Sequence, residues 1–146
     1  MPAGTYTKVS ARKWVAEVSL DARATWTQVK GLTKFGFARK ASSTDTTDFT
    51  DDGQEKSEIM SRGADCKLEG FFLEDSTGAR DPGQANVETY ADAVGAASVG
   101  DFRLTSPNGK KYTFSASVEI NDIGGGNNDK TSWGATLHRV GALAIT

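Results

Sequence analysis

A glycine-rich segment, GGGNNDKT at residues 124–131, comes near the phosphate-binding pattern G-x-x-x-x-G-K-[ST]. That loop needs a glycine before the lysine, because the backbone wraps closely around a phosphate there. Asp129 stands at this position and would place a carboxylate beside the anion. A strand pattern follows the segment, whereas the motif requires a helix. We therefore interpret residues 124–130 as a Gly-rich hairpin loop and expect no cofactor there.

The run DFTDDG at residues 48–53 fits positions 1, 3, 5 and 6 of a calcium-binding loop. The twelfth position of such a loop carries a bidentate glutamate, but this chain has Ile59 there and Glu58 one residue too early. No helical pattern flanks the run. We expect no dedicated metal site.

His138 is the only histidine, so any Ser-His or Cys-His machinery would need it. On its predicted strand it shares a face with Thr136 and opposes Trp133, and no nucleophile motif accompanies it. Cys66 alternates with Leu68 on a predicted core face, which indicates a buried, inert thiol. Carboxylates abound, but in a segment without apolar walls to raise a pKa. We predict that the protein is not an enzyme.

The composition excludes several other classes. The chain has 146 residues, a formal charge of −2, 25% charged and 37% hydrophobic residues, which is typical of one globular domain spanning residues 1–146. One cysteine excludes an internal disulfide framework. No apolar stretch approaches the roughly 20 residues that cross a bilayer, and the first residues, MPAGTYTKVSARKW, lack the apolar core of a secretory signal. We therefore expect no membrane insertion. With its negative net charge, the chain also lacks the excess of Lys and Arg that is typical of nucleic-acid-binding proteins.

The polar and glycine-rich segments must be positioned mainly by strands. Alternation of apolar and polar residues is clearest at residues 111–120, where five apolar side chains predict one buried face. The sequence SPNG at residues 106–109 predicts a hairpin turn before that strand. Further strands are expected around residues 14–20, 25–29, 65–73, 102–104 and 132–140. The pattern predicts a mostly-β fold with a two-sheet antiparallel sandwich or barrel.

A single helical stripe interrupts this pattern at about residues 82–97. Val87, Tyr90 and Val94 recur at helical spacing. Asp81 is a suitable N-cap, with Pro82 at the first helical position and a glutamine where a capping box places one. We expect one helix packed on the side of the sheets.

Residues 41–58 form a segment unlike the rest, with six acidic residues, one lysine and a single large aromatic residue, Phe49. Loops of this length are usually functional or mobile. A merely solvated acidic loop is the plain alternative.

Two stretches, residues 26–53 and 105–141, share an ordered set of features. The first begins WTQVKGLTKF and, after a Ser/Thr run, ends TDTTDFTDDG; the second reads TSPNGKKYTFSASVEINDIGGGNNDKTSWGATLHRVG. A W-x-x-V-x-G strand, a Thr/Asp loop ending in D-G, a PNG-x-x-YTF strand, a glycine loop and a final strand, in this order, resemble the major tail protein family. These are the tail tube proteins of long-tailed bacteriophages.

The resemblance implies a structural virion protein that forms hexameric rings, which stack into a hollow tube for genome delivery. It implies assembly in the host cytoplasm and location in the phage tail. The implied partners are further copies of the chain, the tail tip, tape measure and terminator proteins, and double-stranded DNA in transit. An N-terminal arm at residues 1–12 is expected to belong to the same domain.

Two groups of residues receive roles from this resemblance. The acidic segment corresponds in place to a loop that reaches the adjacent ring in relatives, with Phe49 as an anchor. Its predicted contact residues are Asp45, Asp48, Phe49, Asp51, Asp52 and Glu55. A bore of neutral and acidic groups would let DNA slide, because phosphates held by Lys or Arg resist movement. The predicted lumen face is Thr113, Ser115, Ser117 and Glu119, although alternation alone also fits an outer wall.

Three alternatives remain open at this point. Two belong to the same particle class, namely the inner tube of a contractile injection system and a tail terminator ring. The third is a monomeric host- or carbohydrate-binding β-sandwich, in which Trp14, Trp26 and Trp133 would stack on sugars.

Overall fold

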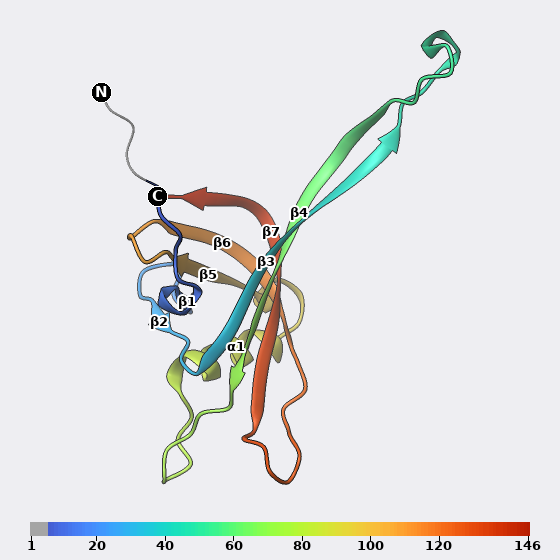
Figure 1. Ribbon diagram of the computed structural model, residues 1–146. Coiled ribbons are helices and arrows are strands. Elements are labelled where there is room, and N and C mark those ends of the chain that lie inside the picture. Colours follow the sequence, from blue (N-terminus) through green and yellow to red (C-terminus); the bar gives the residue numbers. More distant parts are fainter. Residues whose placement is uncertain (1–5) are drawn as a thin grey trace.

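The computed structural model describes residues 6–146, so residues 1–5 of the predicted N-terminal arm lie outside the described residues, as does the side chain of Asp51. The described chain is mostly β, with one antiparallel sheet in the strand order β2-β1-β5-β6-β7-β4-β3 and one α-helix (Figure 1). The strands and the helix are β1 (Val15–Ser19), β2 (Thr27–Gln28), β3 (Leu32–Asp45), β4 (Ser57–Phe71), α1 (Pro82–Ala91), β5 (Val99–Thr105), β6 (Lys111–Ile120) and β7 (Ser132–Ile145); three short 3-10 helices are η1 (Ala11–Lys13), η2 (Phe49–Asp51) and η3 (Gly95–Ser98).

The sheet curls until its last strand, β3, lies against strands near its other end. The Trp14 ring, just before β1, lies 5.3 Å from the Phe35 ring of β3, measured between centroids. Phe37 of β3 meets Phe114 of β6 at 5.7 Å. Two parts of one sheet therefore face each other across the core. Each part buries one face, so its strands alternate apolar and polar residues as the strands of a two-layer sandwich would. The expectation of two separate sheets is wrong, because backbone pairing joins all seven strands.

β6 confirms the alternation read from the sequence. Phe114 and Ala116 are fully buried, whereas the polar residues between the apolar ones lie on the opposite face. The predicted turn before β6 is present, since the amide of Gly109 donates to the carbonyl of Ser106 at 2.9 Å. Gly109 has φ of 91°, in the left-handed region that favours glycine.

Helix α1 begins where the sequence predicts and ends earlier. The Asp81 carboxylate accepts from the amide of Gln84 at 3.2 Å, and Pro82 occupies the first turn. Val87 is fully buried against the sheet. The helix ends at Ala91 rather than near residue 97, so Val94 is exposed instead of extending the stripe.

Gln84 has a different role from the one that the capping box assigns. Its side chain is fully buried, and Nε2 donates to the carbonyls of Lys30 at 2.9 Å and Phe71 at 2.7 Å. Oε1 accepts from the amide of Leu73 at 3.1 Å. One side chain thus ties the first turn of α1 to the start of β3 and the end of β4.

Gln84→Ala should lower the free energy of unfolding by about 3 kcal/mol, because three backbone groups lose their hydrogen bonds to a buried side chain. Urea unfolding followed by circular dichroism measures this. The matched control, Gln54→Ala, removes an exposed glutamine and should change stability by less than about 0.5 kcal/mol. Equal effects of the two substitutions would contradict the tether.

Candidate assembly surfaces

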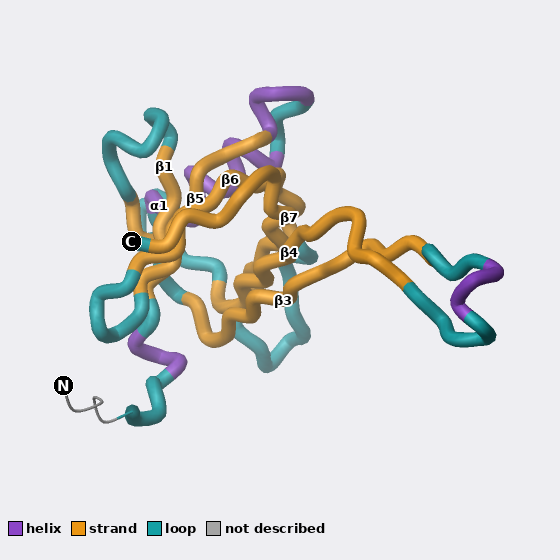
Figure 2. The backbone as a smooth tube through the Cα atoms, turned by 90° about the horizontal axis from the view of Figure 1, so that it is seen from above, coloured by secondary structure: helices purple, strands orange, loops and turns teal. Residues whose placement is uncertain are grey.

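β3 and β4 form a two-stranded arm that projects from the rest of the molecule. β4 pairs with β7 only up to Asp65. Beyond it, within the described residues, β3 and β4 pair with each other alone, as far as Asp45 opposite Ser57. At about 3.3 Å per residue, this carries the tip roughly 25 Å beyond the sheet, and Figures 1 and 2 show the arm projecting from the body. Residues 41–45 and 57–58, expected in a loop, are therefore strand.

The tip of the arm is locally folded. The hydroxyl of Thr47 donates to the carbonyl of Lys56 at 3.1 Å and accepts from its amide at 2.7 Å. Oδ1 of Asp48 accepts from the amide and the hydroxyl of Thr50, at 2.8 and 2.6 Å. The Phe49 side chain at the start of η2 is fully exposed. The tip is therefore held in a defined conformation by hydrogen bonds, with the Phe49 ring exposed to solvent.

The predicted acidic residues surround this ring in sequence and are exposed. They are Asp45, Asp48, Asp52 and Glu55, whereas the side chain of Asp51 lies outside the description. Hydrogen bonds from the side chain and amide of Thr47 hold the pKa of Asp45 below its ordinary value. In the part of the chain that the structure describes, no group of three His, Cys, Asp or Glu side chains is placed to hold a metal.

The predicted lumen residues share one face of β6, on the side of the sheet away from the core. The Ser115 hydroxyl donates to Asp101 at 2.8 Å, and Arg23 donates to Asp101 at 3.0 Å and to Ser115 at 3.2 Å. Ser117 lies between Val99 and His138 in register. Thr113 and Glu119 complete the row. The structure brings these four residues together, and their place in an assembly stays a prediction.

Three cations beside this face are held by carboxylates, whereas Lys111, on the same face of β6, has no ion pair among the described residues. Arg103, opposite Thr113, binds Glu17 at 2.8 Å. Arg23 binds Asp101, and Lys40 binds Asp65. A paired cation offers less to a phosphate than a free one, because its charge is already neutralised.

His138 lies in an ion cluster at the root of the arm. Nδ1 is 2.8 Å from Oδ1 of Asp65, and Nε2 is 3.2 Å from Oε2 of Glu119. Asp65 also binds Lys40. Hydrogen bonds to Asp65 and then Glu119 raise the pKa of His138, and hydrogen bonds from Lys40 and then His138 lower the pKa of Asp65. The cluster links β3, β4, β6 and β7 where the arm leaves the sheet.

This cluster should make stability depend on pH. A raised pKa means that the contribution of His138 is fully present below its ordinary value of 6.5 and is lost as pH rises through the folded-state value. The lowered pKa of Asp65 means that its contribution disappears as pH falls below 3.8. The melting temperature of the wild type should therefore exceed that of His138→Gln near pH 5.5, and the gap should shrink by about pH 8.5. Thr136→Gln, on the same face, is the control; a gap independent of pH would contradict the assignment.

The other candidates from the sequence, the Gly-rich loop and Cys66, have structural roles. In the Gly-rich loop, the Asp129 carboxylate accepts from the amide of Gly126 at 2.9 Å, so it occupies the position where a phosphate would bind, and a strand follows. Cys66 is buried, and burial raises the pKa of its thiol to about 12. No helix among residues 6–146 is long and apolar enough to cross a membrane.

Of the three tryptophans, Trp133 is buried, with Nε1 donating to Glu88 at 3.3 Å. The guanidinium of Arg103 covers one face of Trp26, 4.5 Å from the ring centroid. Trp14 packs against Phe35 and lines a groove described next. Of the three, Trp14 alone lines an apolar hollow that a partner could enter.

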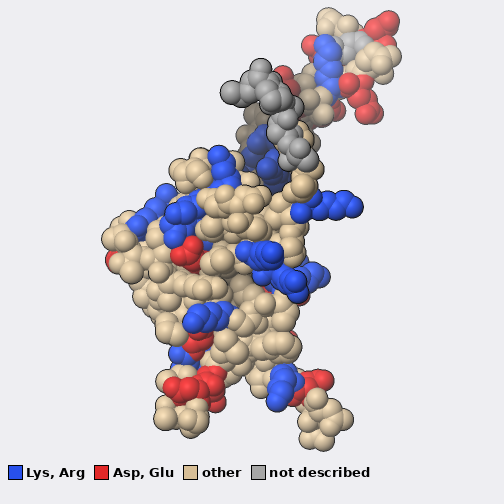
Figure 3. All heavy atoms as spheres, turned by 60° about the vertical axis from the view of Figure 1, so that its left-hand side comes forward, with Lys and Arg blue, Asp and Glu red and all other residues tan. Residues whose placement is uncertain are grey.

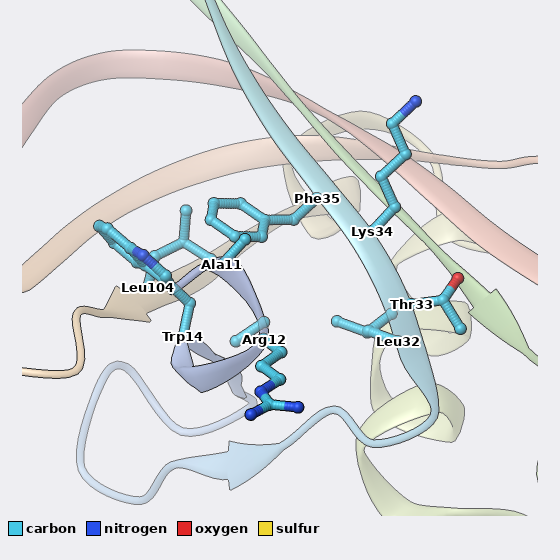
Figure 4. A pocket seen from close by; sticks show the side chains of 9 residues that line it. Ala11, Arg12, Trp14, Leu32, Thr33, Lys34, Phe35 and Leu104 are labelled. Atoms are coloured by element: carbon cyan, nitrogen blue, oxygen red, sulfur yellow. The ribbon is translucent and has the colours of Figure 1, made fainter. Parts of the chain in front are cut away.

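Sequence reasoning did not find this groove. A hollow of about 510 Å³ lies between η1 and β3, with Trp14, Phe35 and Leu104 among its walls. In Figure 4, Phe35 and Leu32 point toward Trp14, while Lys34 points away. A second hollow of about 160 Å³ shares the same three walls and adds Phe37, Arg39, Tyr112 and Leu143. We call the two hollows the aromatic groove. The alternating Phe35 and Phe37 were its only sequence signal.

Solved structures share this fold. A chain from the tail of an empty gene transfer agent particle, computed with helical refinement and C6 symmetry, has a TM-score of 0.68 at 19% identity, and the match covers 94% of this chain and 98% of that one. A chain from the virion of a native gene transfer agent particle has a TM-score of 0.65 at 20% identity, with the same coverage. A chain from the six-fold symmetrised baseplate of the anti-feeding prophage has a TM-score of 0.59 at 8% identity, covering 100% of this chain and 97% of that one. No protein-family model matches the chain, and no curated protein matches it by sequence.

Proposed function

We propose that this protein is a structural tail protein that self-assembles into stacked hexameric rings, forming a hollow tube through which DNA is delivered. The observation that carries the proposal is the fold shared, over 94% of the chain, with a chain from a tail of C6 symmetry. In this proposal residues 1–146 act as one domain without enzymatic activity. It assembles in the host cytoplasm and resides in the virion, with tail tip, tape measure and terminator proteins as partners.

The arm supports this function physically. A two-stranded projection held roughly 25 Å from its own sheet exposes an aromatic side chain that a monomer gains nothing by exposing. Contact with another copy would bury that ring. The arm is therefore the proposed inter-ring element.

The outward β6 face supports the proposed lumen. Its hydroxyls and Glu119 carry no positive charge, and the neighbouring Arg23, Arg103 and Lys40 are ion-paired, which leaves Lys111 at the start of β6 as an unpaired cation among the described residues of this face. DNA can slide past such a surface without releasing and recapturing counterions at each step.

A second candidate is a ring at the baseplate of a contractile particle, favoured by the match that covers the whole chain. The two candidates differ in the length of the assembly. Negative-stain electron microscopy of the purified, concentrated protein, with light scattering alongside, separates them. Long hollow tubes of uniform width support the tube; single rings that never stack favour the second candidate.

A further inference from the structure

The aromatic groove is an accessible apolar surface on the body of the molecule. Trp14 keeps two aromatic contacts there, with Phe35 at 5.3 Å and Tyr112 at 5.8 Å. Its named lining contains arginines and no acidic side chain among the described residues. A complementary occupant would place an apolar ring against the aromatic walls and negatively charged groups beside the arginines.

The hairpin tip of the same chain has both properties. Phe49 is fully exposed, and the acidic side chains Asp52 and Glu55 are exposed within six residues of it. We infer that the aromatic groove is the receptor for the Phe49 tip of a second copy. This inference rests on the proposed function and names the surface that receives the arm.

Charge complementarity favours this occupant. Arg12 lies at the mouth of the larger hollow, and Arg39 lines the smaller one. Figure 3 shows Lys and Arg side chains spread over the visible face of the body, and acidic side chains at the hairpin tip beside a few basic ones. The tip and the body thus carry opposite charge where they would meet, which steers association and fixes register.

The geometry requires two molecules. The arm is a paired ribbon directed away from the sheet, so its tip cannot fold back onto the groove of its own chain without breaking the β3–β4 pairing. Each copy therefore offers one tip and one groove at different places. Such a heterologous contact leaves a free tip and a free groove after every addition, which is the arrangement that extends an assembly.

Chemical cross-linking tests this contact directly. Ala11→Cys places a thiol on the wall of the groove, and Thr50→Cys places one beside Phe49. The native Cys66 is buried and its pKa is raised to about 12, so it does not compete for a short bis-maleimide. The assembled double variant should give a ladder of dimers, trimers and longer chains on a denaturing gel. The matched control combines Thr50→Cys with Ala79→Cys, on an exposed loop away from the groove, and should give no ladder.

The outcomes separate the contact from the function. Tubes without a ladder would overturn the groove as the receptor and leave the proposed function standing. A ladder without tubes would support the contact and count against the tube. Absence of both, also when tail tips are supplied as initiators, would overturn both.

A charge exchange gives a second test. Arg12→Glu with Arg39→Glu should slow assembly at least tenfold, and so should Asp52→Lys with Glu55→Lys. Combining the four substitutions should restore at least half of the lost rate. No recovery in a chain with the wild-type circular dichroism spectrum would overturn the pairing.

Discussion

Phe49→Ala is expected to leave a folded monomer whose polymerisation falls at least about 30-fold, since a central aromatic anchor typically contributes 2 kcal/mol or more. The ring is fully exposed and supports no core contact, so the melting temperature should stay within about 1 °C of the wild type. Turbidity and electron microscopy measure assembly, and thermal unfolding measures the fold. Deleting residues 44–52 should have the same effect.

Phe71→Ala is the matched control. This phenylalanine is 46% exposed and lies at the opposite end of β4 from the tip, so its replacement makes the same chemical change and removes exposed apolar surface without touching the arm. Wild-type polymerisation of Phe49→Ala would remove the tip from the interface. Equal losses in both variants would point to a general effect of apolar surface.

Lysine substitution on the proposed lumen face should slow DNA delivery roughly tenfold or more while tubes still form, because each ring would gain six positive charges that grip phosphates. Ser117→Lys is a cleaner test than Ser115→Lys. The Ser115 hydroxyl donates to Asp101, so replacing Ser115 would also disturb the ion pair between Asp101 and Arg23. Particles carrying the variant are compared with wild type for genome transfer and tail length.

Ser76→Lys makes the same chemical change on an exposed loop outside the β6 face and should transfer DNA normally. Loss of tubes in Ser117→Lys would place this face in a subunit contact. Normal transfer with normal tubes would place it on the outer wall.

Local pattern was sufficient for the elements with one buried face. The alternation in β6 and the Asp81–Pro82 start of α1 both appear in the structure, because burial on one side leaves a periodic signal. The end of α1 was missed since Val94 continues the stripe, whereas the helix ends at Ala91 with Asp92 as its C-cap.

The arm and the groove depend on contacts that periodicity does not record. Residues 41–45 and 57–61 are solvated on both faces, so they lack the alternation by which a strand is recognised, and only pairing with each other makes them strands. The aromatic groove exists because β3 folds over to meet Trp14, far from it in the sheet order. Composition picked out the acidic segment, and its place in an assembly stays a prediction.

Helical reconstruction from cryo-electron micrographs of the purified, concentrated protein tests the central claim most directly. The account predicts a hollow tube with six copies in each ring, the arm bridging successive rings and the Thr113–Glu119 face toward the bore. A protein that stays monomeric at high concentration, and still does so when tail tips are supplied as initiators, would contradict it.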